Sequence, residues 1–214
     1  MSDLLPVPPG ASAATALDAG GRALLRGPWR RKNRRPRTLA AVGVALALLA
    51  VARPDPASLA LGTALVVAGQ GLRLLAAGYL VKTRELAVSG PYRHLRHPLY
   101  AGVLLVGAGF ILAAGPGVAR VALPLGLAFF LGYYLPYKER VESKRLEAVH
   151  GPVFTAYRAA VPALLPRLRP WRDGAPGAPW SFARLVANDE LGAALATALF
   201  LAALAARTWL PAGC

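Results

Sequence analysis

Five apolar runs alternate with basic segments along the 214 residues of the chain. The runs cover residues 38–52, 57–81, 99–119, 121–137 and 191–206. A helix that crosses a bilayer needs about 20 mostly apolar residues, and about 17–25 are tolerated. The three middle runs have this length, and the first and last are flanked by arginines whose long side chains can reach the membrane surface. The pattern predicts an all-α, polytopic membrane helix bundle of about five transmembrane helices.

The composition agrees with this prediction. Of the residues, 56% are hydrophobic and 16% are charged, whereas soluble domains average about 45–50% apolar and about 25% charged residues. Five apolar helices in a chain of this length would leave too little polar surface to cover them in water. The composition therefore argues against a soluble globule, and also against a disordered chain, which requires low hydrophobicity.

The basic residues lie on one side of the predicted membrane. Lys and Arg number 25 against 10 Asp and Glu, for a net charge of +15. The segments before the first run, between the second and third, and between the fourth and fifth hold 21 of these 25 residues. Loops on the opposite side hold three, and Arg73 lies inside the second run. Because positive loops stay in the cytoplasm, we expect a cytoplasmic N-terminus in a bacterial plasma (inner) membrane.

Residues 1–37 are predicted to be a flexible basic tail and residues 38–210 the membrane domain, with an extra C-terminal span at about 190–209. The basic cluster 30–37 adjoins the first run, where anionic headgroups attract each Lys or Arg by about 1 kcal/mol. Membrane lipids are therefore expected partners. Nucleic acid is not expected, because this cluster offers bases little aromatic surface on which to stack.

The segment before the third run, GPYRHLRHPLY at 90–100, contains two Arg, two His and two Tyr. Cationic donors suit a carboxylate or phosphate, and aromatic faces suit a cation or a flat ring. His94 and His97 are three residues apart, but no further ligand stands at metal-binding spacing. We therefore expect a polar site at this membrane boundary and no metal in it.

Two further charged residues stand out. An intramembrane charge such as that of Arg73 costs at least about 2.5–3.5 kcal/mol, so Arg73 should face a cavity or a partner, or extend to the cytoplasmic surface. Glu142 lies on a helix predicted over 137–157, which Gly151 and Pro152 should end. Its neighbours Glu139 and Glu147 are expected to pair with basic residues of the same helix. The proline-rich residues 161–179 predict an extended strap.

The run GPYRHLRHPLYAG at 90–102 resembles the G-x-Y-x-x-x-R-H-P-x-Y-x-G signature of the isoprenylcysteine carboxyl methyltransferase family. Residues 71–73 and 142–166 resemble two other motifs of the same family, so the core motifs cover residues 71–166. The chain departs from the family pattern at four positions, where the family has tryptophan, glutamate, phenylalanine and tyrosine. These positions are Leu75, Ser143, His150 and Phe154.

This resemblance implies an integral membrane methyltransferase that moves a methyl group from S-adenosylmethionine to a lipophilic acceptor entering from the bilayer. The acceptor could be a prenylated cysteine, a lipid amine, a quinone-like phenol or a small thiol. The resemblance places the cofactor at the cytoplasmic face, bound by Tyr92, His97, Tyr100 and Glu142. Arg96 and Arg73 are then the expected catalytic residues. The alternatives are a small membrane transporter or channel subunit without catalysis, and a structural membrane protein.

Overall fold

The computed structural model describes residues 34–80, 86–172 and 179–209, and within these ranges it contains helices and no strand. The α-helices are α3 (Arg34–Val51), α4 (Pro56–Tyr79), α5 (Pro98–Ala113), α6 (Pro116–Phe129), α7 (Leu135–Ala160), α8 (Phe182–Ala187) and α9 (Glu190–Ala206). Short 3-10 turns cover Gly90–Arg93 and Arg207–Trp209, and a π-helical turn, Phe130–Tyr134, joins α6 to α7. The all-α prediction is confirmed.

Each predicted apolar run is helical, but the helices differ in length. Within the described residues, three helices are long and apolar enough to cross a membrane, judged by length and composition: Pro56–Tyr79, the continuous Pro116–Ala160, and Glu190–Trp209. Two shorter apolar helices, Thr38–Val51 and Pro98–Ala113, accompany them. The chain divides into two units at residues 1–44 and 45–214, and the contacts described below lie within the second. The predicted tail 1–37 lies mostly outside the described residues, and α3 begins at Arg34, three residues before the expected end of the tail.

The third apolar run is interrupted at Gly115, where the chain turns. This glycine has φ 109°, and Pro116 then begins α6. The turn lies against the α3–α4 link, where the Arg53 amide donates to the Ala114 carbonyl at 2.8 Å. At the same link, Asp55 caps α4 by accepting from the amides of Ala57 and Ser58 at 3.0 Å.

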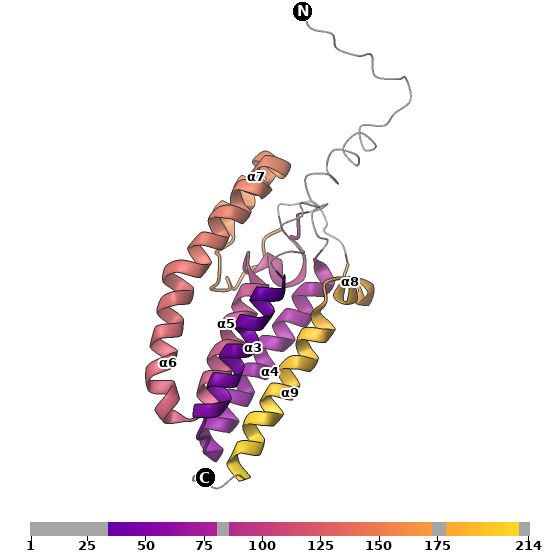
Figure 1. Cartoon of the computed structure of the whole chain (residues 1–214). Helices are drawn as coiled ribbons and strands as arrows, with labels where there is room; N and C mark the ends of the chain where they lie inside the picture. The colour runs from indigo at the N-terminus through magenta and orange to yellow at the C-terminus, as the bar shows by residue number, and fades with distance from the viewer. Residues whose placement is uncertain (1–33, 81–85, 173–178, 210–214) are drawn as a thin grey trace, which may run out of the picture. The chain divides into compact units, whose positions relative to one another are not determined.

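Among the described helices, α4 and α5 make the most extensive contact, and α9 also packs on α4 (Figure 1). The α4–α5 contact depends on small residues. A Cβ atom at Gly69 would lie 2.8 Å from the Gly102 carbonyl oxygen, and one at Gly62 would meet the backbone of α5 at Gly109. Glycines that let helix backbones approach closely are a common basis of helix association in membranes.

Helix α7 is interrupted at the predicted stop. Gly151 takes non-helical angles (φ 49°, ψ −129°), so the first helical segment ends there, and a second segment continues to Ala160. Gly151 and Pro152 therefore divide α7 at a kink, because Pro152 cannot donate a backbone hydrogen bond to the preceding turn.

Of the predicted strap, residues 161–172 form neither helix nor strand and contain several bends, whereas 173–178 lie outside the described residues. Its backbone pairs with the loop that precedes α5. The amides of Arg96 and His97 donate to the Pro162 and Ala163 carbonyls at 2.8 and 3.0 Å. Trp171, at the other end of the strap, is buried in a cluster with four further side chains. These are Val88, Phe154, Tyr157 and Val161.

Candidate functional site

A cluster of polar side chains lies where α5 begins, facing α7. We call it the boundary cluster, and its members are Arg96, His97, Tyr100, Glu139 and Glu142. Arg96 forms an ion pair with Glu139 through its Nη2 atom. The Tyr100 hydroxyl donates to Glu142 Oε2 at 2.9 Å, and His97 Nδ1 lies 3.9 Å from the same oxygen. The rings of His97 and Tyr100 are 5.3 Å apart. Four of the residues selected from the sequence are thus brought together.

Burial gives the boundary cluster its electrostatic character. The side chains of Arg96 and His97 are 10% and 9% exposed. Arg96 Nε and Nη1 and His97 Nε2 are buried without a hydrogen-bond partner among the described residues. Burial lowers the pKa of His97, and the Glu142 carboxylate opposes this effect only in part, so the imidazole is neutral at pH 7. The arginine donors suit an anionic group, while Glu142, with a 44% exposed side chain, is open to water.

Tyr92 and Glu139 also make contacts between separate segments in this region. Tyr92 is buried, its carbonyl accepts a hydrogen bond from the Tyr157 hydroxyl at 2.7 Å, and burial raises its pKa above the ordinary value. Glu139 was expected to pair with basic residues of its own helix, and this expectation is wrong, because it pairs with Arg96 of a different segment. A clue was available: Glu139 and Glu142 are three residues apart and share one helix face.

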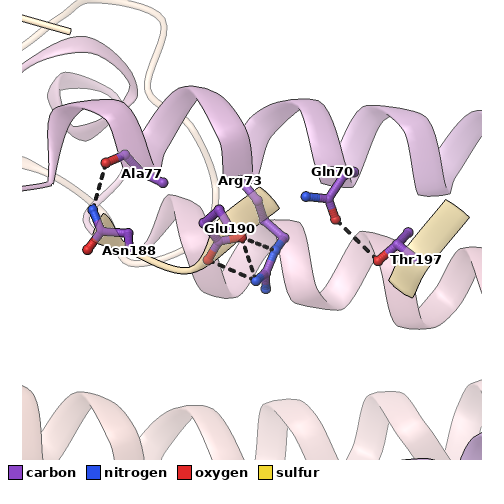
Figure 2. Close-up of polar contacts among 6 residues, drawn as sticks. All are labelled: Gln70, Arg73, Ala77, Asn188, Glu190 and Thr197. Atoms are coloured by element: carbon purple, nitrogen blue, oxygen red, sulfur yellow. Dashed lines mark hydrogen bonds and ion pairs between the residues drawn. The ribbon is translucent and has the colours of Figure 1, made fainter. Parts of the chain in front are cut away.

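A second polar contact lies between α4 and α9. Arg73 meets Glu190 in a two-pronged ion pair, with Nε to Oε2 at 3.1 Å and Nη2 to Oε1 and Oε2 at 3.0 and 2.8 Å (Figure 2). Their side chains are 18% and 10% exposed. On α5, Gly102 leaves room for the aliphatic stem of Arg73, since a Cβ atom there would collide with Arg73 Cγ. The expectation that Arg73 faces a partner is confirmed, and an acidic acceptor would have to displace Glu190.

Further hydrogen bonds extend this contact along the two helices (Figure 2). Thr197 donates to Gln70 Oε1 at 3.4 Å, whereas Gln70 Nε2 is buried without a partner among the described residues. Asn188 Nδ2 donates to the Ala77 and Leu80 carbonyls at 2.9 and 3.1 Å. We call the whole set the polar seam. Its members are Gln70, Arg73, Asn188, Glu190 and Thr197.

Sequence reasoning selected Arg73 but missed the α9 side of the seam. A signal was present, because Glu190 and Thr197 are seven residues apart and therefore share a helix face, as Gln70 and Arg73 do at a spacing of three. What the sequence alone could not tell is that these two faces meet.

No group of three or more His, Cys, Asp or Glu side chains within residues 34–80, 86–172 and 179–209 is placed to hold a metal ion. His94 and His97, the pair considered from the sequence, have different surroundings. His94 Nδ1 lies 2.8 Å from the Arg167 carbonyl oxygen of the strap, whereas His97 faces Glu142.

Two curated bacterial proteins are similar to part of the chain. The cobalt-zinc-cadmium resistance protein CzcN of Cupriavidus metallidurans is 39% identical over 114 residues, which cover 52% of this chain and 49% of the relative. The nickel-cobalt-cadmium resistance protein NccN of Alcaligenes xylosoxydans xylosoxydans is 31% identical over 93 residues, covering 43% and 41%. The chain therefore matches about half the length of these relatives or less. No family model and no solved structure matches the chain.

These relatives correct the interpretation drawn from the sequence motifs. They are named for metal resistance, and no model of a methyltransferase family matches. The identification with the isoprenylcysteine carboxyl methyltransferase family, and the methyltransferase activity it implies, are therefore wrong. The roles given to the boundary cluster in binding S-adenosylmethionine depended on that identification. The contacts within the cluster are independent of that identification.

Proposed function

We propose that this chain is a small, non-catalytic membrane subunit of transporter or channel type that acts in bacterial resistance to divalent metal cations. The names of the relatives support this proposal, since they refer to resistance to cobalt, zinc, cadmium and nickel. Among the alternatives considered from the sequence, a transporter or channel subunit requires polar residues on more than one spanning helix.

The Arg73–Glu190 ion pair is the observation that carries the proposal. It joins two helices long and apolar enough to span a membrane. Ionisable residues inside membrane helices are costly and commonly mark ion or substrate pathways. Stability alone does not demand such a pair, because an apolar pair of similar volume can hold two helices together equally well. The charges are therefore best explained by a role in function.

The distribution of basic residues supports a position in the bacterial inner membrane with the N-terminus in the cytoplasm. In that orientation the boundary cluster lies at the cytoplasmic surface, because it precedes α5 on the same side as the basic segments. Cations would then meet Glu142 at the surface and the polar seam within the membrane.

Metal tolerance of a bacterium that carries the chain tests the proposal. Deleting the gene that encodes the chain should lower growth at increasing concentrations of cobalt, zinc, cadmium or nickel and raise the metal content of the cells. A plasmid copy should restore both. A copy with Arg73→Leu should fail to restore tolerance, whereas the charge swap Arg73→Glu with Glu190→Arg should restore it at least in part.

Arg120→Gln is the matched control, because Arg120 is exposed and its Nε donates to the Pro116 carbonyl at the other end of the apolar helices. It should restore tolerance as the unaltered chain does, at the same level of protein in the membrane. Unchanged tolerance to all four metals after deletion would refute the proposed function.

A further inference from the structure

Two segments outside the long apolar helices carry large apolar side chains that the chain leaves exposed. In the strap, Leu165 and Leu168 are 80% and 97% exposed. In and beside the short helix α8, Trp180, Phe182 and Val186 are 43%, 59% and 47% exposed. Such side chains are costly to leave in water, so a surrounding medium or partner is expected to cover them.

Both segments lie at the same end of the bundle. The strap is hydrogen-bonded to Arg96 and His97, directly before α5 begins at Pro98. Next to α8, the Ser181 amide donates to the Gly78 carbonyl at 3.0 Å, in the last turn of α4. The strap and α8 are therefore placed where one apolar helix ends and the next begins, which is the height of a membrane surface.

The charge of these segments favours a membrane surface over a protein partner. The described strap, residues 161–172, contains Arg167, Arg169 and Arg172 and no acidic residue, and Arg184 lies in α8. Arg169 and Arg172 are exposed and lie within four residues of the exposed leucines. Alternating apolar or aromatic and basic side chains suit a bilayer interface, where acyl chains and anionic headgroups lie a few ångströms apart.

We propose that residues 165–172 and 180–186 form a lipid collar that binds a leaflet containing anionic phospholipid. Leu165 and Leu168 enter the acyl region, and Arg169 and Arg172 bind the phosphate groups. The aromatic side chains Trp180 and Phe182 cover the same interface beside the end of α4. This lipid-binding role goes beyond the proposed function and does not depend on it.

Depth measurements test the apolar half of the collar. In the full chain with Cys214→Ser, a cysteine is introduced at Leu168 and labelled with an environment-sensitive dye, and the protein is reconstituted in phosphatidylcholine and phosphatidylglycerol vesicles. The dye should emit at shorter wavelength than in water and be quenched by lipids with brominated acyl chains. A label at Val149, which is 61% exposed and lies two residues before the α7 kink at Gly151, is the matched control and should show neither effect. Equal, weak quenching at both positions would overturn the proposal and favour a protein partner for the strap.

Lipid titration tests the basic half. Phosphatidylglycerol added to the detergent-solubilised chain should raise its melting temperature. Arg169→Gln with Arg172→Gln should raise the lipid concentration required about 30-fold, the effect of two arginine–headgroup contacts. Lys144→Gln with Arg145→Gln, which removes the same charge from exposed positions on α7, should leave that concentration unchanged. Equal effects of the two pairs, or none from either, would refute a specific role for the collar.

Discussion

Helix α4 contacts α5 on one face and α9 on another, and the two contacts are built from different groups. Towards α5 it presents Gly62 and Gly69, and the backbones approach so closely that a Cβ atom has no room. Towards α9 it presents Gln70 and the guanidinium group of Arg73, which form a hydrogen bond and an ion pair, while the aliphatic stem of Arg73 lies against Gly102 of α5. Lipid tails are as apolar as leucine, so apolar burial gives membrane helices little reason to associate.

The two faces therefore hold α4 to its neighbours by different interactions, and different substitutions should weaken them. The α5 face should be sensitive to added volume and insensitive to charge elsewhere. The α9 face should tolerate changes of volume, but it should be disrupted when a charge loses its partner.

Breaking the ion pair should have the largest effect on stability. Arg73→Leu leaves the Glu190 carboxylate buried without its counter-ion, and the loss of one partner of a buried pair costs about 3–5 kcal/mol. Replacing both residues by leucine should recover most of that loss. The free energy of unfolding in mixed micelles measures both effects, and a double variant as unstable as the single one would contradict this account of the α9 face.

Added side-chain volume on the α5 face should cause the second-largest loss of stability. Gly62→Ala places a methyl group against the backbone of α5, and overpacking costs about 1–3 kcal/mol. Gly71→Ala is the matched control, because a Cβ atom there meets nothing within 4 Å; it should be neutral or stabilising by up to about 1 kcal/mol. The same unfolding assay applies, and equal losses in the two variants would show that close backbone approach does not hold α4 to α5.

Removing the weaker bond of the polar seam should have a smaller effect. Thr197→Val keeps the shape of the side chain and deletes the hydrogen bond to Gln70. Such bonds between membrane helices average about 0.6 kcal/mol. An unfolding free energy lowered by more than the Gly62→Ala change would reverse the ranking of the two faces.

The boundary cluster belongs to neither face and should respond weakly to pH. Burial lowers the pKa of His97 in the folded chain, so the unfolded chain binds a proton first as the pH falls. Stability from the neutral imidazole is complete above the unfolded pKa of about 6.5 and is lost as the pH falls below it. His97→Gln should flatten this part of the melting-temperature profile, and Arg93→Gln should not. If the His97 variant kept the wild-type slope of melting temperature against pH, the pH response would belong to another group.

The positions of the helices follow from the sequence more readily than their contacts do. The apolar runs are local signals, and the run 57–81 predicts α4 well. The turn after α5 is marked by Gly115 and Pro116, although the apolar run continues through it without a change in polarity. The neighbours of α4 were harder to predict, since an apolar helix surrounded by lipid has little amphipathic pattern to show which face meets which helix.

The candidate sites show the same limit. Arg96, His97, Tyr100 and Glu142 were selected from local residue types, and the structure brings them together across more than 40 residues of sequence, with 42 between Tyr100 and Glu142. The partner of Arg73 could not be selected in this way, because Glu190 is an ordinary residue of a helix start until α9 is packed on α4. A motif match alone then led to the wrong family, since similar local residues occur in proteins named for other functions.

The distance between Arg73 and Glu190 along the chain also has a consequence in time. The two residues are 117 positions apart, and at a synthesis rate of about 5–20 residues per second Glu190 leaves the ribosome roughly 6–23 s after Arg73. During this interval α4 and α5 can already pair through their glycines, whereas the arginine still lacks its carboxylate. The nascent chain therefore passes through a stage in which the Arg73 cation of α4 has no counter-ion. A chaperone or insertase that shields this cation would act at this stage.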